Sequence, residues 1–341
     1  MSACKEAVLA VIGGGRWARV IVSVLAKMDL AFDRLIIVSS ANSETMVRFI
    51  EGQQFMSHMS FDVVASLDEL LTNYNVNAAI VANSAHQHFA TSSLLIDHGV
   101  NVLIEKPVVL SMAHAHTLLK KAVARGICLV PGLQYRFCSY IHDCADELSR
   151  LRKVPLSFFV EWSDQIGEIR YGETKTYDRT IDIAQDVMPH IWAILSTIFQ
   201  QTQINIDSCQ NDRDGLCANF SVTMNDGVQG QIRLQRDAVQ RQRIICIQFN
   251  SNESLSMDFS YEPGTIYWNK KVISLDPNWD RKPKPLASQL HYFLSTITQG
   301  VTAESDIRAC LDSVSFSEQA SILLHTSQKS HREQMRNNLS L

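Results

Sequence analysis

A glycine-rich turn near the N-terminus has residue types that can hold an anion. Gly13-Gly14-Gly15-Arg16-Trp17-Ala18 fits the pattern G-x-G-x-x-G/A and stands between an apolar run and an amphipathic segment. In such a turn Gly13 would permit a sharp bend, Gly15 would let a pyrophosphate approach the backbone, and Ala18 would keep the following helix close to a sheet. A tight turn without a ligand would also use glycine, so the neighbouring elements decide between the two interpretations.

The end of the second apolar run indicates which dinucleotide such a turn would accept. Sites for NAD place an Asp or Glu there to bind the ribose hydroxyls, and that carboxylate repels a 2′-phosphate. Here Ser39-Ser40-Ala41-Asn42 ends the run, and no acid precedes Glu44. The hydroxyl and amide donors, together with Arg16, suit the extra phosphate, so we predict NADP, with NAD as the alternative. Asn42 or Ser43 can cap the next helix at the same time.

One lysine stands where a reacting group would be expected. Glu105-Lys106-Pro107 follows the fifth apolar run, at the carboxyl edge where open α/β sheets bind their ligands. The spacing alone leaves open whether Lys106 is catalytic or an ordinary surface lysine.

These motifs need a parallel sheet to bring them together. Over the first 130 residues, short apolar runs alternate with segments whose apolar residues recur every three or four positions, which is the pattern of β-α-β units. This order predicts a doubly wound parallel sheet of the Rossmann type, an α/β dinucleotide-binding domain that covers residues 1–131. The predicted strands are 7–12, 34–39, 61–64, 78–82, 101–104 and 127–130.

The rest of the chain, residues 132–341, has a different pattern. Segments such as 228–235 alternate apolar and polar residues with period two, which predicts a mostly antiparallel open sheet with one covered face. Helical periodicity over 186–199, 286–298 and 304–325 completes an α+β domain. We expect this second domain to hold the substrate and to pair subunits through the exposed strand positions Gln229, Gln231, Arg233 and Gln235, giving a homo-oligomer.

Taken together, the motifs resemble those of the Gfo/Idh/MocA oxidoreductase family. The matching segments are Gly13–Ala18, Asn83–His88, Glu105–Pro107, Gln134–Phe137 and the D-x-x-x-H segment Asp186–His190. The resemblance implies a Rossmann domain that binds a nicotinamide dinucleotide. The residues expected to contact it are Gly13, Gly15, Arg16, Trp17, Ser39, Ser40, Asn83, His88, Glu105 and Lys106.

The same resemblance assigns catalytic roles to Lys106 and His190, which in that family face the nicotinamide. A hydride that reaches a carbonyl carbon leaves an alkoxide, which Lys106 would stabilise while His190 supplies or removes the proton near neutral pH. Asp186 precedes His190 by four residues and would orient the imidazole from the same helix face. Two alternatives stay open: Asp186 is only a helix N-cap, with Pro189 in the first turn, and His190 is only a buried core histidine.

Candidate substrate contacts lie in two segments of the sequence. One is near the start of the second predicted domain, and the other is the polar segment before the predicted helix 186–199. They are Tyr135, Arg136, Trp162, Arg170 and Lys175. The cations would suit an anionic or highly oxygenated group, although a solvated loop would carry the same charges. Met188 and Ala193 stand where many sugar dehydrogenases of the family have Gly and Asp, which disfavours a plain cyclic sugar or inositol.

We therefore predict an NADP-dependent oxidoreductase that acts on the carbonyl or hydroxyl of a polar small molecule, for example a modified or nucleotide-linked sugar. One alternative is an imine reductase of specialised metabolism, which would use the same cofactor. The lysine favours a C=O substrate, because an alkoxide needs stronger stabilisation than an amine. The other alternative is a dinucleotide-sensing regulatory protein without turnover.

Composition excludes several other classes. With 46% hydrophobic and 19% charged residues the chain can bury a large core, and its net charge of −4 offers no broad basic field for nucleic acid. The eight cysteines form no C-x-x-C pair, so we expect free thiols in a reducing cytoplasm and no metal site. The sequence contains no run of 18 or more uncharged apolar residues, so we expect no membrane span.

Overall fold

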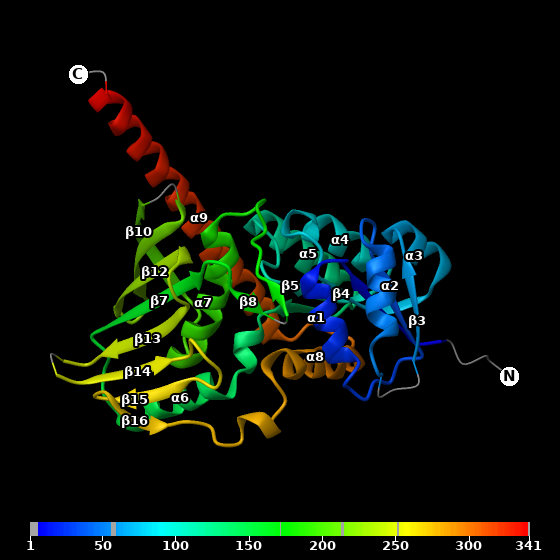
Figure 1. Cartoon of the computed structure of the whole chain (residues 1–341), viewed down its shortest axis with the longest axis horizontal. Helices are drawn as coiled ribbons and strands as arrows, with labels where there is room; N and C mark the ends of the chain where they lie inside the picture. Colours follow the sequence, from blue (N-terminus) through cyan, green and yellow to red (C-terminus); the bar gives the residue numbers. More distant parts are fainter. Residues whose placement is uncertain (1–5, 56–58, 171, 213–214, 251, 340–341) are drawn as a thin grey trace. The chain divides into compact units, whose positions relative to one another are not determined.

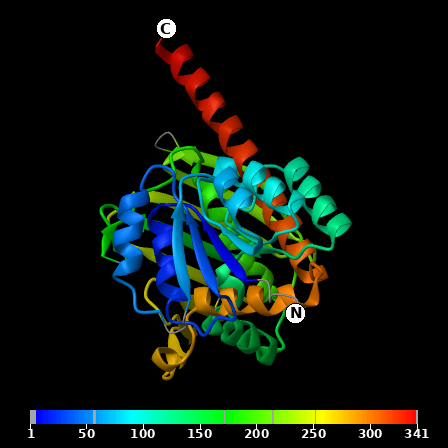
Figure 2. The same ribbon diagram turned by 90° about the vertical axis from the view of Figure 1, so that its right-hand side faces the viewer.

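The chain divides into two compact units in the computed structural model, which describes residues 6–55, 59–170, 172–212, 215–250 and 252–339. The first unit comprises Met1–Gln134 and Pro285–Leu311, and the second comprises Tyr135–Lys284 and Asp312–Leu341. Figures 1 and 2 show the chain from two sides, and each unit is described by itself below.

A six-stranded parallel sheet forms the centre of the first unit. Its order is β3-β2-β1-β4-β5-β6, and every neighbouring pair is parallel. The strands are β1 (Val8–Ile12), β2 (Arg34–Val38), β3 (Ser60–Val64), β4 (Val76–Val81), β5 (Asn101–Glu105) and β6 (Leu129–Gly132). Chain order reverses beside β1, which creates the switch point where such sheets bind ligands. The predicted Rossmann domain is confirmed.

Helices cover both faces of this sheet (Figure 2). The helices are α1 (Arg16–Leu25), α2 (Ser43–Glu51), α3 (Leu67–Asn73), α4 (His88–Asp97) and α5 (Met112–Arg125), with the 3-10 turn η1 (Ala85–Gln87) before α4. Their ends follow local chemistry, since the Ser66 side chain accepts a hydrogen bond from the Glu69 amide and Gly126 closes α5 with a φ of 62°. The central strand β1 is buried at all five positions, whereas the edge strand β3 is mostly half-buried.

A late segment of the chain also belongs to the first unit, although the sequence placed it in the second domain. It contains α8 (Pro285–Thr296) and η5 (Ile297–Gln299). The apolar face of α8 enters the core cluster that contains α1 and α2, with Leu290 and Phe293 fully buried. Thr302 then donates to the Ile127 carbonyl and accepts from the Leu129 amide. These contacts with β6 and the core explain why the segment joins the Rossmann fold.

An eight-stranded mixed sheet forms the second unit, with order β10-β11-β12-β7-β13-β14-β15-β16. All neighbours are antiparallel except β12 and β7. The strands are β7 (Ser157–Gln165), β10 (Ile204–Asp212), β11 (Cys217–Met224), β12 (Gln229–Ala238), β13 (Gln242–Gln248), β14 (Ser254–Asp258), β15 (Thr265–Trp268) and β16 (Lys271–Ser274). A short hairpin of β8 (Ile169–Arg170) and β9 (Glu173–Thr174) stands apart. The predicted α+β layout is confirmed.

Helices α6 (Ser139–Leu151) and α7 (Ile183–Phe199) pack on each other in the second unit, and the final helix is α9 (Glu304–Leu339). Two further 3-10 turns are η2 (Gln134–Phe137) and η4 (Trp279–Arg281). The period-two pattern of the strands is visible in β12, where Gly230, Ile232 and Leu234 are buried and the residues between them are exposed. One face of the sheet is therefore covered and the other is open.

Helix α7 begins earlier than the sequence indicated. Asp182 is its N-cap, and a capping box joins the Asp182 side chain to the Gln185 amide and the Gln185 side chain to the Asp182 amide. This box starts the helix at Ile183, so Pro189 lies in its interior rather than in the first turn. The alternative that Asp186 is only a helix N-cap is wrong, because Asp182 occupies that position.

Candidate active site

The glycine turn follows β1 at the carboxyl edge of the parallel sheet. Gly13 has a φ of 143°, and a Cβ there would lie 2.6 Å from the Ala82 carbonyl oxygen, so only glycine fits. A Cβ on Gly15 would meet nothing within 4 Å, which leaves this position open for a ligand. Gly15 is also the N-cap of α1 and offers no side-chain acceptor to the first helical amides. The turn thus leads into a helix N-terminus without a side-chain cap, which is the arrangement that phosphate sites use.

Two polar groups beside this turn suit an additional anion. Among the described residues, the buried Arg16 Nη1 and the buried Ser39 Oγ have no hydrogen-bond partner. The Ser39 hydroxyl lies against the turn, because a Cβ on Gly14 would be 2.1 Å from its oxygen. Ser40 is exposed at the same strand end. Buried donors of this kind are normally satisfied, so the residues fit a bound dinucleotide phosphate.

Asn83 and His88 connect the end of β4 to the residue after Lys106. The buried His88 ring lies with Nδ1 2.8 Å from the Pro107 carbonyl oxygen and Nε2 3.1 Å from that of Asn83. The Asn83 amide donates to the Thr91 hydroxyl at 2.9 Å. His88 therefore ties two loops of the sheet edge together, which positions Asn83 and Lys106 relative to each other.

Glu105 is buried at the end of β5. The Lys106 amide donates to its carboxylate at 3.3 Å, and a Cβ on Gly132 would lie 2.7 Å from the Glu105 Cα. Burial raises the pKa of Glu105 to about 7, although the Trp17 indole, Lys106 and the Gln289 amide each act to lower it. The carboxyl group next to Lys106 in the chain is therefore held in a desolvated environment at the end of β5.

The predicted cofactor residues accordingly gather at one edge of the first unit. They follow β1, β2, β4 and β5, whose carboxyl ends meet at that edge. Those the structure brings together are Gly13, Gly15, Arg16, Trp17, Ser39, Ser40, Asn83, His88, Glu105 and Lys106.

In the second unit, an aromatic cluster surrounds His190. The imidazole stacks on the Trp162 indole with ring centroids 5.4 Å apart and an interplanar angle of 18°. The Tyr135 ring contacts both of these rings edge to face, with its centroid 5.0 Å from that of the imidazole and 5.8 Å from that of Trp162. His190 is 9% exposed, so most of its surface is in contact with protein. Three residues that lie far apart in the sequence thus form one group, and Arg136 belongs to the same turn η2 as Tyr135.

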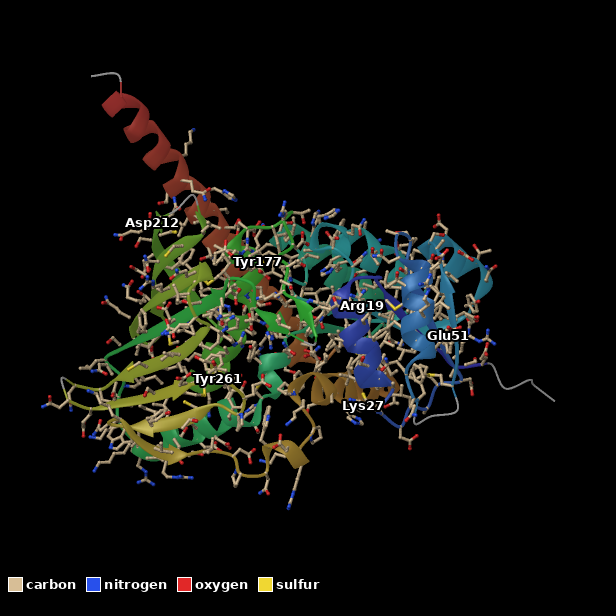
Figure 3. The ribbon with its side chains drawn as sticks, in the orientation of Figure 1. Arg19, Lys27, Glu51, Tyr177, Asp212 and Tyr261 are labelled. Carbon is tan, nitrogen blue, oxygen red and sulfur yellow. The ribbon has the colours of Figure 1, made fainter. Side chains whose placement is uncertain are left out.

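The Asp186 side chain on α7 is bound by an arginine of strand β12. Arg236 donates to its carboxylate at 3.1 Å, and the Arg236 guanidinium lies 4.6 Å from the centre of the Tyr177 ring, which is labelled in Figure 3. The Tyr177 hydroxyl donates to Asp237 at 3.2 Å. Asp186 is thus the charged partner of Arg236 one helical turn before His190.

Lys175 and Arg170 take part in an ionic network. Lys175 lies 2.7 Å from Asp164 and 3.9 Å from Glu168, and Arg170 lies 3.8 Å from Glu168. Arg243, fully buried, donates to the other Asp164 oxygen, and its guanidinium lies 3.8 Å from the centre of the Trp162 ring. The predicted substrate cations therefore meet the aromatic cluster through Arg243 and Trp162.

Sequence inspection missed several residues of these networks. Arg243 could have been noticed, because it shares strand parity with Ile245 and Ile247 and so occupies an inward position. Gln289 interrupts the buried stripe of α8 in the same way. Asp164 has no comparable signal, because it lies in a polar segment whose burial depends on the distant β13.

No group of three or more side chains suited to a metal occurs in the described part of the chain. Within the same ranges, no helix is long and apolar enough to cross a bilayer. The cysteines that the structure describes are all free thiols.

Comparison with known proteins agrees with this architecture. Residues 8–133 match the family described as Gfo/Idh/MocA oxidoreductases with an NAD-binding Rossmann fold. An uncharacterized oxidoreductase, YhhX, from Escherichia coli is 34% identical over 89 residues, covering 26% of this chain and 25% of that protein. The 2,7-anhydro-N-acetylneuraminate hydratase of Mediterraneibacter gnavus is 31% identical over 81 residues, covering 24% and 22%. The match thus spans about a quarter of each curated relative's length.

Solved structures resemble the whole chain in fold. The UDP-N-acetylglucosamine 3-dehydrogenase GnnA from Acidithiobacillus ferrooxidans has a TM-score of 0.71 at 20% identity, covering 94% of this chain and 98% of that one. KijD10, a 3-ketoreductase from Actinomadura kijaniata in complex with TDP-benzene and NADP, has a TM-score of 0.73 at 16% identity, covering 92% and 96%. Residues 8–133 therefore match the NAD-binding Rossmann domain of the Gfo/Idh/MocA oxidoreductase family, and the solved structures extend the likeness of fold to the rest of the chain.

Proposed function

We propose that the chain is an NADP-dependent oxidoreductase that transfers a hydride between the nicotinamide and the carbonyl or hydroxyl carbon of a polar small molecule. The observation that carries this proposal is the family's glycine turn, with its uncapped helix N-terminus, on the same sheet edge as Lys106. A dinucleotide held by that turn would lie at the carboxyl edge of the sheet, where β5 ends immediately before Lys106.

The preference for NADP rests on the end of β2. Ser39, Ser40 and Arg16 offer donors there, two of them buried and without partners among the described residues, and no carboxylate follows the strand. A 2′-phosphate would satisfy those donors, whereas NAD would leave them unpaired. Titration of the purified protein with NADPH and NADH tests this preference, and tighter binding of NADH would refute it.

Lys106 and His190 are proposed to handle the substrate oxygen and its proton. The nicotinamide supplies or accepts the hydride when bound. In the reducing direction, the Lys106 ammonium hydrogen-bonds the carbonyl oxygen as negative charge develops there, and His190 donates a proton to that oxygen. In the oxidising direction His190 accepts the proton of the hydroxyl group. Positioned acid-base assistance of this kind is worth about 10² to 10⁴ in rate.

Asp186 supports this chemistry as a positioning residue. Its carboxylate, fixed by Arg236, lies one turn before His190 on α7. A fixed negative charge on the same helix face stabilises the protonated imidazole and restricts its orientation.

The substrate is proposed to be a polar and oxygenated molecule such as a modified or nucleotide-linked sugar. One protein of similar fold is a UDP-N-acetylglucosamine 3-dehydrogenase, and another is a 3-ketoreductase in complex with TDP-benzene and NADP. In this chain Tyr135, Arg136, Trp162, Arg170 and Lys175 are proposed to contact the substrate. The aromatic rings would pack on the sugar and the cations would bind its oxygen atoms.

Two variants test the catalytic proposal. With a carbonyl substrate drawn from a panel of keto sugars and NADPH as reductant, Lys106→Met and His190→Gln are expected to lower kcat by at least a hundredfold while both still bind NADPH. Lys271→Met, on the exposed strand β16, is the control and is expected to keep full activity. If the wild type binds NADPH but reduces no carbonyl compound, and Lys106→Met changes nothing measurable, a cofactor sensor replaces the enzyme.

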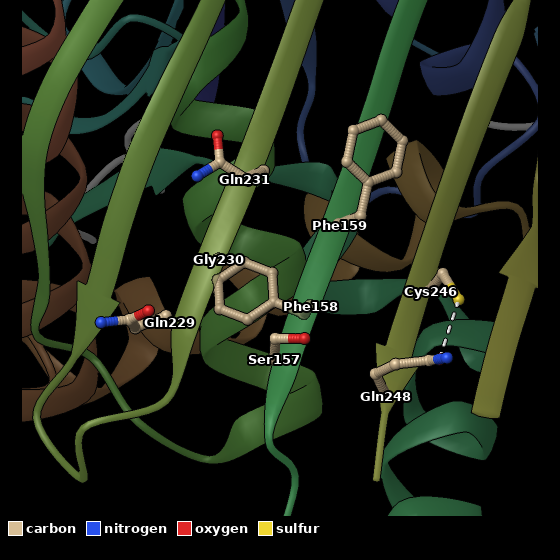
Figure 4. Close-up of a pocket in the computed structure, with 8 residues that line it drawn as sticks. All are labelled: Ser157, Phe158, Phe159, Gln229, Gly230, Gln231, Cys246 and Gln248. Carbon is tan, nitrogen blue, oxygen red and sulfur yellow. Dashed lines mark hydrogen bonds between the residues drawn. The ribbon is translucent and has the colours of Figure 1, made fainter. Parts of the chain in front are cut away.

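Self-association is proposed through the open face of the eight-stranded sheet. Figure 4 shows the hollow at its centre, a pocket of about 390 Å³ where Phe159, an exposed aromatic residue, lies beside Gln231 and Cys246. The flanking row of Gln229, Ser157 and Gln248 carries no charge. The centres of subunit interfaces are typically poor in charge and rich in aromatic residues, which fits the pocket around Phe159, while Arg233 is a charged residue on the same face of β12. Light scattering is expected to give a mass above that of one chain, and a monomeric mass would remove this proposal.

A further inference from the structure

We propose that His88 is a buried imidazolium, and that its two N–H groups hold the loops after β4 and β5 together at the edge of the sheet where the cofactor is proposed to bind. His88 would thereby be a positioning residue for Asn83 and Lys106. The inference rests on the proposed function for the place of the dinucleotide. The charge state of His88 is a property of the first unit alone.

Both ring nitrogens of His88 lie against carbonyl oxygens of the main chain. Nδ1 is 2.8 Å from the Pro107 oxygen, and Nε2 is 3.1 Å from the Asn83 oxygen. Both distances are those of N–H···O hydrogen bonds. A backbone carbonyl oxygen accepts hydrogen bonds and cannot donate one. Both nitrogens must therefore donate for the two contacts to be hydrogen bonds at the same time.

The imidazolium is the form of the ring that supplies two donors. A neutral imidazole carries one N–H group and one lone pair in either tautomer, whereas the imidazolium carries an N–H group on both nitrogens. In the neutral ring of His88, the lone pair of one nitrogen would face a carbonyl oxygen at 2.8 or 3.1 Å. Two negative partial charges at that distance repel each other. The geometry therefore favours the charged ring.

The surroundings of His88 contain effects of both signs. The ring is 1% exposed and belongs to the first residue of α4, and both burial and the positive end of a helix dipole disfavour a cation. Against them, charge-assisted hydrogen bonds are about twice as strong as neutral ones, and burial strengthens them further. The cation forms two such bonds, whereas the neutral ring forms one weaker bond and keeps one repulsive contact. The pair of carbonyl groups therefore decides the balance.

The two loops carry groups that the proposed function needs. Strands β4 and β5 are parallel neighbours, so the loops that follow them are adjacent. The Asn83 amide nitrogen donates to Thr91 at 2.9 Å, and its buried Oδ1 has no hydrogen-bond partner among the described residues. That oxygen is oriented to accept a hydrogen bond from a ligand. On the other loop Pro107 follows Lys106, so the charged ring of His88 fixes an acceptor and the proposed catalytic lysine relative to each other.

The proposed charge makes cofactor binding depend on pH. When the ring loses one proton at higher pH, one carbonyl contact becomes repulsive and the loops are held less firmly. Helix α4 packs on α5, β4 and β5, and other ionisable side chains on these neighbouring segments are His86, Glu105, Lys106, His114 and His116. Burial raises the pKa of Glu105 to about 7, and its ionisation would stabilise the imidazolium while the Lys106 ammonium would oppose it. The measurement must therefore follow His88 itself.

A purely structural role for His88 makes a different prediction. A neutral buried histidine would donate one hydrogen bond from one protonated nitrogen, and its other nitrogen would carry no proton. The affinity for the cofactor would then not change when the ring titrates. The protonation of the two nitrogens separates the two roles.

The first experiment observes the ring directly in the full chain without cofactor. Protein labelled with ¹⁵N at histidine is studied by long-range ¹H–¹⁵N correlation spectroscopy at pH 7, and the His88→Gln variant identifies the signals of His88. An imidazolium gives two nitrogens of similar chemical shift that each carry a proton, whereas a neutral ring gives two widely separated shifts. We expect both nitrogens of His88 to be protonated. A nitrogen without a proton at pH 7 would overturn the inference.

The second experiment measures NADPH binding by calorimetry. At pH 7, His88→Gln and His88→Phe are expected to bind NADPH about tenfold more weakly than the wild type, because the charge-assisted bonds to both loops are lost. The wild type should approach the affinity of these variants over the pH range in which its His88 signals titrate. His98→Gln, at the opposite end of α4, is the matched control and should bind as the wild type does. Both wild-type measurements stand even where a His88 variant fails to fold.

The outcomes distinguish this inference from the proposed reaction. A wild type that binds NADPH with the expected pH dependence but reduces no carbonyl compound would support the role of His88 and refute the reaction. Turnover that depends on Lys106, together with a neutral His88 ring, would do the opposite. Equal NADPH affinity of the wild type, His88→Gln and His88→Phe at pH 7 would overturn the positioning role.

Discussion

Replacing Glu105 by Gln should stabilise the protein in a way that depends on pH. The buried carboxyl group has a pKa of about 7 in the folded chain, against an ordinary value of 4.5. Glutamine keeps its shape and its contact with the Lys106 amide but cannot ionise. The variant therefore isolates the free energy of placing a negative charge at the end of β5.

The sign and size of the effect follow from linkage. Below pH 4.5 the carboxyl is protonated in both the folded and the unfolded chain, and its ionisation has no effect on stability. Between pH 4.5 and 7 the unfolded chain loses the proton while the folded chain retains it, so the wild type becomes less stable as the pH rises. A pKa difference of roughly 2.5 corresponds to about 3 kcal/mol at high pH.

Urea unfolding at pH 5 and pH 8.5, followed by circular dichroism and by fluorescence, measures this difference. The stability of Glu105→Gln relative to wild type is expected to increase by about 2 to 3 kcal/mol between the two pH values. Glu51→Gln, a change of an exposed carboxylate on α2 that is labelled in Figure 3, is the control and should show no such trend. A relative stability that is the same at both pH values would show that the Glu105 carboxyl is not desolvated, and the reasoning would fail.

Three other changes test the architecture. Gly13→Ala places a Cβ 2.6 Å from the Ala82 carbonyl oxygen at a φ of 143°, so NADPH binding measured by calorimetry should be lost while the second unit keeps its circular dichroism. Gly230→Ala places a Cβ within 2.1 to 2.5 Å of the Phe158 ring and should destabilise the chain by about 1 to 3 kcal/mol in urea; an unchanged midpoint would contradict the packing. Asp182→Ala removes the capping box of α7 and should lower the free energy of unfolding in urea by about 1 to 2 kcal/mol. Asp182→Asn should retain much of that stability, because asparagine is also a good N-cap.

The first unit could be predicted from the sequence because its signals are local. The inner strands β1, β2 and β4 are largely apolar runs buried on both faces, and the residues that follow them reach one sheet edge by the geometry of a parallel sheet. Gly13 is required by a close approach of the Ala82 backbone, which the pattern G-x-G-x-x-G/A already implies. The pattern therefore predicts that the residues proposed to bind the cofactor follow strands that end at one sheet edge, and the structure has them there.

Other features depend on contacts between distant segments and could not be predicted. The apolar stripe of α8 shows that the helix is buried but not which sheet it covers, and its contact with the first unit depends on Leu290 and Phe293 meeting α1. The start of α7 was misplaced because Pro189 was treated as a first-turn residue, whereas the Asp182 capping box starts the helix before it. The role of Asp186 likewise depends on Arg236, which lies 50 residues later in the sequence.

The net charge of the chain gives a misleading impression of its sites. The sequence contains 35 acidic and 31 basic residues, which indicates no affinity for anions. Yet the first unit presents Arg16 Nη1 and Ser39 Oγ beside the glycine turn as buried donors without partners among the described residues. Because water and salt screen exposed charges over roughly 8 to 10 Å, the surplus carboxylates elsewhere on the surface have little influence on these partly buried groups. Local burial and pairing, rather than the total charge, therefore determine which ligands a site favours, and the donors beside the glycine turn favour negatively charged oxygen.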